Sequence, residues 1–280
     1  MKVHQFFFFL LVTLLPVQLG LHFWPSWAHI LGRRIDYLSP TLYATDILIV
    51  FIFALWARRK TLPPSKYIFP FLIFATVNIF FARSPAVSAY MWLKAAELSF
   101  LGWYIYKTRP SMFLIARVLS VGVIFSSLLA VVQFALQHSL NGILWFAGER
   151  TFDVSTPGIA RAVIGGREFL RPYATFPHPN VLGGFLAASF PLLISAWRTK
   201  KMPLFIAALG IGVVGLLFTF SRSAIIAGAV GITATLGILK KKYRPLFLVP
   251  FVFAGVMFLL PLSPGDETIV VRRELNAVAV

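Results

Sequence analysis

Arginines that flank apolar segments are the residues of this 280-residue chain best suited to chemistry. Arg222 stands between two serines, Ser221 and Ser223, in the stretch TFSRSA. A guanidinium is planar and carries five N–H donors, so it can bind a phosphate or a carboxylate through two parallel hydrogen bonds. A helix beginning at this turn would add free N–H groups and the positive end of its dipole. The sequence therefore predicts an anion site at Arg222. The alternative is an arginine that reaches out to lipid headgroups.

A second candidate segment runs from Arg171 to Asn180 and contains three prolines. Proline fixes its own φ and restricts the residue before it, so polar side chains here can be held in place at a membrane surface. Asn180 is the expected helix N-cap, and Gly183 and Gly184 permit close helix packing. His178 is a candidate base or hydrogen-bond donor, although a structural role is favoured for it. A rigid helix entrance without substrate contact remains the other interpretation of the segment.

Other charged residues lie within or beside apolar segments. Lys94 and Glu97 share one helical face and can neutralise each other, and a structural pair is favoured over a proton path. Asp46 is expected either to line an outward cavity or to form a surface salt bridge. Arg272 and Arg273 follow the last apolar segment. They are solvated charges if taken alone, but they can complete an arginine cluster around a pyrophosphate with the two arginines described above.

The elements that must position these residues are long apolar runs. Hydrophobic residues make up 59% of the chain and charged residues 12%, and the 29 phenylalanines are spread along its length. Runs of this kind match the thickness of a bilayer. We therefore expect an all-α integral membrane protein, a single transmembrane domain over residues 1–280. It is a polytopic bundle of about nine spans, at residues 6–21, 42–56, 67–81, 89–106, 112–136, 181–197, 203–220, 224–239 and 246–262.

The distribution of basic residues predicts the topology. With the N-terminus in the cytoplasm, every lysine in a connection falls on the cytoplasmic side, as the positive-inside rule requires. The C-terminus then lies outside. The basic residues on the outward side are all arginine, which favours recognition of phosphate or carboxylate, with chance as the alternative. They are Arg33, Arg34, Arg83, Arg150, Arg161, Arg167, Arg171, Arg222, Arg272 and Arg273.

Residues 138–180 form the one long outward loop between the fifth and sixth spans, and they exceed the length of a simple connector. Residues 143–146 are apolar and are expected to lie in the membrane interface as a short amphipathic piece. The rest of the loop is expected to arch over an outward cavity.

Several classes of protein are excluded by composition. The absence of cysteine rules out disulfides and thiolate chemistry. The net charge of +17 arises from short clusters between apolar runs rather than from a patch, so nucleic acid is not an expected partner. No glycine-rich phosphate loop and no cytoplasmic cluster of carboxylates is present for ATP hydrolysis. The outward acids show no metal-ligand spacing, so neither a metal nor another cofactor is expected.

Three stretches resemble the superfamily of O-antigen ligases and O-antigen polymerases of the bacterial envelope. They are RPYATFPHPNVLGGFL at 171–186, TFSRSA at 219–224 and RIDYLSPTLYATDILI at 34–49. The resemblance implies a glycosyltransferase of the bacterial cytoplasmic (inner) membrane that works without a metal. Such an enzyme transfers a glycan from a polyprenyl-pyrophosphate carrier to an acceptor sugar on a lipid A core, a growing glycan or a protein glycan. Membrane lipids are further partners.

The resemblance also implies site residues. Arg222 and one of Arg272 and Arg273 would hold the pyrophosphate, and a family histidine on a large outward loop would activate the acceptor. The chain stops at Val280. We therefore expect it to be truncated, without the catalytic loop and the final spans. His178 belongs to a different motif and is not given that role. The candidate substrate-cavity residues are His178, Asn180, Ser221 and Asp46.

Two other functional classes compete with this interpretation. A transporter or flippase for a lipid-linked or anionic substrate would use the same arginines, and paired half-helices or inverted repeats would be its mark. No such repeat is clear in the sequence. A purely structural subunit would leave the arginines of the outward side unexplained.

Overall fold

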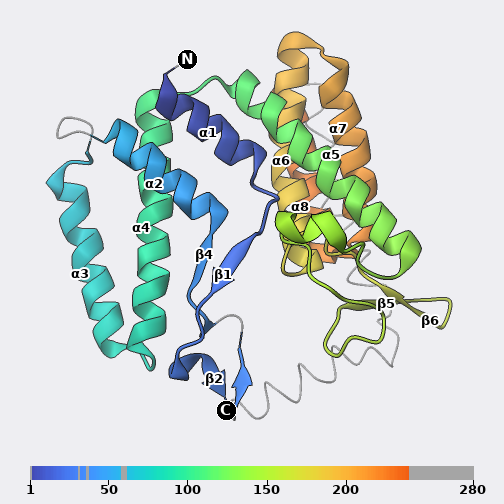
Figure 1. Cartoon of the computed structure of the whole chain (residues 1–280). Helices are drawn as coiled ribbons and strands as arrows, with labels where there is room; N and C mark the ends of the chain where they lie inside the picture. Colours follow the sequence, from blue (N-terminus) through green and yellow to red (C-terminus); the bar gives the residue numbers. More distant parts are fainter. Residues whose placement is uncertain (1, 31, 36–37, 58–61, 240–280) are drawn as a thin grey trace.

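The computed structural model describes residues 2–30, 32–35, 38–57 and 62–239 and is mostly helical (Figure 1). The predicted span at 246–262, together with Arg272 and Arg273, lies outside these residues. The α-helices are α1 Val3–Thr13, α2 Ala44–Trp56, α3 Ser65–Phe81, α4 Pro85–Thr108, α5 Met112–Leu136, α6 Pro179–Lys200, α7 Pro203–Phe218 and α8 Arg222–Leu239. Within the described residues, the short 3₁₀ helices η1 Ser26–Ala28 and η3 Gly142–Ala147 lie in the connections.

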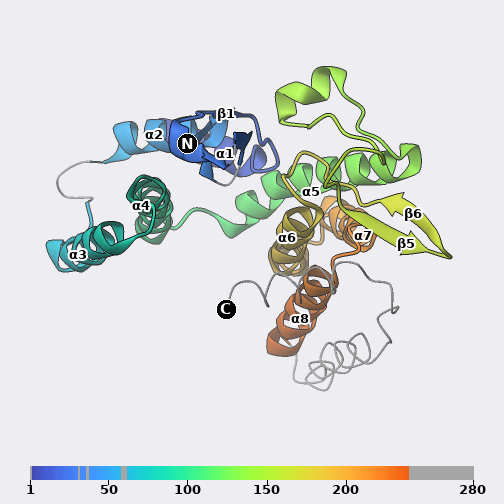
Figure 2. The same cartoon turned by 90° about the horizontal axis from the view of Figure 1, so that it is seen from below.

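Helices α5 to α8 form a bundle, with α5 against α7 and α6 against both α7 and α8 (Figures 1 and 2). Leu182, Leu186, Phe190 and Leu193 of α6 are fully buried in its core. Their spacing of three or four residues places them on one face of the helix. Helix α1 joins this bundle to the rest of the molecule because it packs against both α2 and α5, while α4 packs against α3 and also contacts α2.

Two of the described helices, α5 and α6, are long and apolar enough to cross a membrane by length and composition. The predicted span at 112–136 coincides with α5, and the span predicted at 181–197 lies inside α6. Helix α4 has 24 residues, but it carries lysine and glutamate within its length. The other apolar helices of the described residues are shorter than a full span.

The span predicted at residues 6–21 is wrong as a continuous helix. Helix α1 has 11 residues and ends at Thr13, and the chain then turns. Pro16 explains this end, since a proline has no N–H and its ring clashes with the carbonyl four residues earlier in a helix. The carbonyl of Pro16 accepts a hydrogen bond from the buried Thr175 hydroxyl. The turn after α1 therefore reaches the segment that precedes α6.

The all-α prediction also needs correction, because the connections that the structure describes contain three antiparallel two-stranded ribbons. Strand β1, Gly20–His22, pairs with β4, Thr41–Tyr43, so that α2 begins two residues later than the predicted start of its span. The other ribbons are β2 His29–Ile30 with β3 Arg33–Arg34, and β5 Arg161–Ile164 with β6 Arg167–Leu170.

Successive helices alternate in direction, which separates the connections into two ends (Figure 1). The N-terminus and the α4–α5 and α6–α7 connections lie at the upper end of the view. The α3–α4 connection and the long α5–α6 loop lie at the opposite end, which we call the arginine end. Within the described residues, the basic residues in the connections of that end are all arginine, whereas the upper end also carries lysines such as Lys66, Lys107, Lys200 and Lys201.

Candidate functional site

The α7–α8 turn is the point at which the TFSRSA motif meets the rest of the arginine end. Phe220 has a φ of +49°, a left-handed conformation that is uncommon for a bulky residue. Its ring lies 5.7 Å from that of Phe134 on α5, which helps to hold the residue there. The N–H of the buried Ser221 donates to Thr219 Oγ1 at 3.2 Å, so the turn is closed by its own side chains.

Arg171 joins the two motifs predicted from the sequence. Its Nε donates to the carbonyl oxygen of Thr219 at 2.8 Å, and its Nη2 donates to Asn180 Oδ1 at 2.7 Å. One guanidinium therefore connects the segment before α6 to the turn before α8. Burial lowers the pKa of Arg171, but an arginine pKa is high enough for the side chain to stay charged. The guanidinium is therefore held between the first turn of α6 and the turn that precedes α8.

The N-cap of α6 is His178 and not Asn180, which is a correction to the sequence prediction. Helix α6 begins at Pro179, so Asn180 is already its second residue. The Nδ1 atom of His178 accepts a hydrogen bond from the Asn180 N–H at 3.1 Å. Burial, and then the charge of Arg171, lowers the pKa of His178. The neutral imidazole is the form that can accept this bond, and Asn180 is left to bind Arg171.

A side chain that was not singled out from the sequence holds the Arg171–Asn180 segment in place. Gln133 on α5 is fully buried, and its Oε1 accepts from the N–H groups of Tyr173 at 3.1 Å and Ala174 at 2.7 Å. Its Nε2 donates to the Ala174 carbonyl oxygen at 3.0 Å and to Glu149 Oε1 at 2.8 Å. Ala174 has a φ of +50°, so these bonds hold a strained residue. A lone glutamine near the end of an apolar run was the sequence feature that could have revealed this role.

Glu149 anchors the start of the long loop in a similar way. Its carboxylate is buried and accepts the N–H groups of Leu140 at 2.9 Å and Asn141 at 2.7 Å. Backbone amides and Gln133 therefore pair both of its buried oxygens. The predicted interfacial piece at 143–146 lies in helix η3, where the side chain of Ile143 is 82% exposed. Its place in a membrane interface stays a prediction.

Close packing of α6 on α8 depends on Gly183. A Cβ atom on this residue would lie 2.7 Å from the Cβ of Ala224 and 3.2 Å from Thr219 Oγ1. A Cβ on Gly184 would meet nothing within 4 Å. The sequence predicted close packing for both glycines, and the structure requires it at Gly183 alone.

Arg222 is the first residue of α8 and its side chain is exposed. Among the residues that the structure describes, none forms a hydrogen bond or an ion pair with its guanidinium. It follows Thr219, whose carbonyl binds Arg171, by three residues. The two arginines therefore flank one turn, the first committed to holding it and the second available to a ligand.

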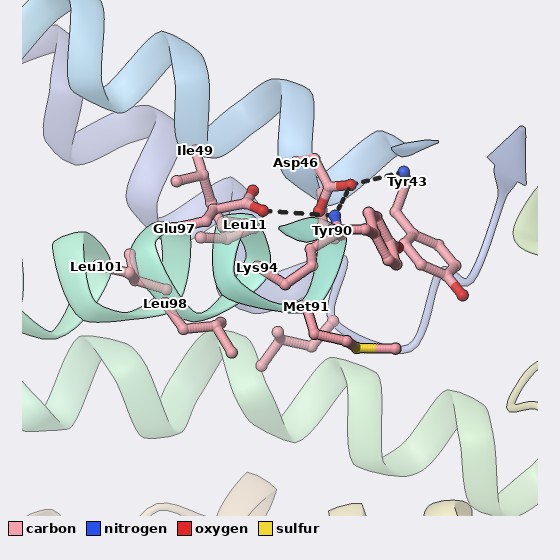
Figure 3. Close-up of a pocket in the computed structure, with 12 residues that line it drawn as sticks. Leu11, Tyr43, Asp46, Ile49, Tyr90, Met91, Lys94, Glu97, Leu98 and Leu101 are labelled. Carbon is pink, nitrogen blue, oxygen red and sulfur yellow. Dashed lines mark hydrogen bonds and ion pairs between the residues drawn. The ribbon is translucent and has the colours of Figure 1, made fainter. Parts of the chain in front are cut away.

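Asp46 lies in a different cluster. Its Oδ2 accepts the Tyr43 N–H at 2.8 Å and forms an ion pair with Lys94, whose Nζ also contacts Glu97 Oε2 at 3.4 Å (Figure 3). The expected Lys94–Glu97 pair is present, with Asp46 as an additional partner. The tyrosines beside it, Tyr43 and Tyr90, were not singled out from the sequence.

No group of three or more metal-binding side chains forms within the described ranges. Comparisons of the chain with protein-family models, with curated proteins and with solved structures each find no match. The geometry of this molecule is therefore the only structural guide to its function.

Proposed function

We propose that the chain is the membrane-embedded part of a glycan transferase of the O-antigen ligase or polymerase type. It would transfer a glycan from a polyprenyl-pyrophosphate carrier to an acceptor sugar at the outer face of a bacterial cytoplasmic membrane. One observation carries the proposal: Arg171 bonds both Asn180 and Thr219, which belong to two separate motifs of the resemblance. Residues far apart in sequence meet at one charged turn.

The bilayer part of the proposal is supported by the exposed surface of the helices. Helix α3 packs mainly against α4, and its apolar side chains are otherwise exposed, with Phe80 and Phe81 each 79% exposed. An apolar surface of this extent suits lipid better than water. The confinement of the lysines in the described connections to the upper end supports a polytopic arrangement with the N-terminus in the cytoplasm.

The proposed binding step uses the arginine end. The exposed guanidinium of Arg222 would bind the pyrophosphate through charge-assisted hydrogen bonds, next to the free N–H groups of the first turn of α8. Arg171 would hold the turn through the Thr219 carbonyl. Stabilising the charge on the departing pyrophosphate would accelerate transfer. Arg272 and Arg273 are proposed as further ligands.

Donor binding tests this proposal directly. The full chain in membrane vesicles would be titrated with a labelled polyprenyl-pyrophosphate glycan. Arg222→Ala removes a charge-assisted contact worth about 1.5–3 kcal/mol, so donor affinity should fall roughly 10-fold to 100-fold. Arg167→Ala removes an exposed arginine from the β5–β6 ribbon of the same end and should leave affinity unchanged.

Equal affinity of the Arg222→Ala protein and the unaltered protein would overturn the site. A second arm separates transfer from transport, using sealed liposomes that carry donor on one leaflet. Movement of intact donor across the bilayer, without a glycosylated acceptor, would show a flippase instead.

A further inference from the structure

Two lysines far apart in the sequence meet at the upper end of the α3–α4 pair. Helices α3 and α4 pack side by side and run in opposite directions (Figures 1 and 2). Lys66 is the second residue of α3, and Lys107 lies in the last turn of α4. Both side chains are exposed. The antiparallel packing therefore brings two cations to one end of the pair.

Aromatic rings connect these two ammonium groups. Lys66 Nζ lies 5.2 Å from the centre of the Tyr67 ring, and Lys107 Nζ lies 4.9 Å from that of Trp103. The Tyr67 and Trp103 rings are themselves 6.3 Å apart, and Tyr106 lies on the other side of Lys107, 5.9 Å from its Nζ. Ring faces attract cations, which holds the lysines in place. We call these five residues the lysine–aromatic cluster.

No carboxylate among the described residues neutralises the lysine–aromatic cluster. Neither Lys66 nor Lys107 forms an ion pair with another described residue. The acidic residues that the structure describes lie in the first turn of α2, within α4 or in the long α5–α6 loop, and they are Asp46, Glu97, Glu149, Asp153 and Glu168. The two positive charges therefore have no protein counterion in the part of the chain that is described.

The start of α3 adds to this positive charge. Its first turn contains no acidic residue, and no side chain caps its N-terminal N–H groups. The positive end of the helix dipole lies at this turn, so a lysine there is unfavourable unless an anion lies beside it. Lys66 occupies that position. Dipole and lysines together favour an anion supplied from outside the chain.

The surface next to the lysine–aromatic cluster favours a lipid as the source of that anion. Apolar side chains continue along α3 from the cluster, and Phe69, Ile73 and Phe74 are exposed. Tyrosine, tryptophan and lysine at the ends of apolar helices lie at the level of the headgroups in a bilayer, where anionic headgroups attract lysines. A soluble anion would make no use of the apolar surface.

We propose that the lysine–aromatic cluster binds the headgroup of an acidic phospholipid of the cytoplasmic leaflet. The phosphate pairs with the ammonium groups of Lys66 and Lys107, and the acyl chains lie along the exposed apolar side chains of α3. This inference rests on the membrane placement proposed above. It assigns a lipid site to the end of the molecule opposite to Arg222.

Two lipids that share a phosphate but differ in net charge provide the test. Phosphatidylglycerol is anionic, whereas phosphatidylethanolamine carries a compensating ammonium group. The full chain would be released from bilayers that contain both lipids in equal amounts, and the retained lipid measured by native mass spectrometry. We expect phosphatidylglycerol to be retained about tenfold more, because each of the two lysines adds a severalfold attraction to an anionic headgroup.

Substitutions of exposed lysines locate the site. Lys66→Gln combined with Lys107→Gln removes both charges and should lower the preference to roughly twofold. Lys66→Arg combined with Lys107→Arg keeps the charges and should retain the preference. The matched control is Lys200→Gln combined with Lys201→Gln, which removes equal charge from the α6–α7 connection at the same end and should leave the preference unchanged. If a variant fails to fold, the two lipids compared on the unaltered chain still decide the inference.

Equal retention of the two lipids by the unaltered chain would overturn the inference. An equal loss of preference in the two glutamine variants would also do so, because it would show a diffuse attraction to the whole basic end. Soluble glycerol phosphate has a similar headgroup without acyl chains. If it displaces phosphatidylglycerol at equal concentration, the site takes free phosphate esters and the lipid assignment is wrong.

These results are distinguishable from a failure of the proposed function. A chain that binds the glycan donor through Arg222 but shows no lipid preference would refute the lipid site alone. A chain that does not enter membranes would refute the membrane placement on which both rest.

Discussion

The α5–α8 bundle and the α2–α4 pair solve the same problem differently, since each places polar groups among apolar side chains. In the bundle, both ends of the Gln133 amide are bonded, and Glu149 is surrounded by N–H donors. In the pair, Glu97 Oε1 has no hydrogen-bond partner among the described residues, and two half-open hollows are lined in part by the charged residues. A saturated network fixes one backbone conformation, whereas an unsaturated one leaves a buried polar atom unpaired at a cost in free energy.

The largest effect is expected from removing the bundle's central amide. Gln133→Leu keeps the apolar volume but strips the acceptor from two backbone N–H groups, at Tyr173 and Ala174. Leaving these buried donors unpaired should destabilise the protein by about 3 kcal/mol. Thermal unfolding in detergent micelles would measure the loss, and amide exchange should accelerate at residues 171–176.

Asn78→Leu provides the counterpart outside the bundle, on α3, which packs against α4 of the open pair. The exposed Asn78 accepts side-chain hydrogen bonds from Ser88 and Trp92, each at 2.9 Å. Because these groups are not enclosed, we expect a loss of less than about 1 kcal/mol. If the two leucine variants lose equal stability, the contrast between the saturated bundle and the open pair is wrong.

The next largest change in stability is expected at the contact of α6 with α8. Alanine substitutions at two adjacent glycines, Gly183 and Gly184, test this contact. Gly183→Ala places a methyl group 2.7 Å from the Cβ of Ala224, so overpacking should cost about 1–3 kcal/mol. Gly184→Ala meets open space and should raise stability by about 0.5–1 kcal/mol through helix propensity. Unfolding of both variants under one set of conditions measures the difference. A tolerated alanine at 183 would mean that α6 and α8 separate without cost.

The sequence predicted those features that depend on residues close together along the chain. Apolar length predicted α5, and glycine at 183 indicated a tight helix contact that the structure bears out. Pro16 was also visible, but its effect on the first predicted span was overlooked. The span was predicted from the length of the apolar run, although a proline within that run ends the helix.

Contacts between distant segments were beyond the sequence. Nothing near Gln133 shows that it bonds the backbone of Ala174, 41 residues away. Likewise, Asp46 and Lys94 are 48 residues apart, so their pairing depends on how α2 meets α4. The three prolines indicated a rigid segment before α6 but not which residue caps the helix, because His178 and Asn180 can both accept a backbone hydrogen bond.

The smallest expected effect is a dependence of protein stability on pH, which arises from His178 at the arginine end of the bundle. Asn78 does not titrate, so no such effect is expected at that position. His178 has a pKa below the usual 6.5 in the folded protein because of burial and the nearby Arg171. The unfolded chain therefore takes up a proton first as the pH falls, which favours unfolding. The stability that His178 contributes is present above pH 6.5 and is lost as the pH falls from there through the lower pKa of the folded protein.

His178→Asn retains an N-cap acceptor without this titration. Melting temperatures of the two proteins, compared across this range, should diverge as the pH falls, with the unaltered protein losing more. Parallel curves would show that the protonation of His178 is not linked to folding.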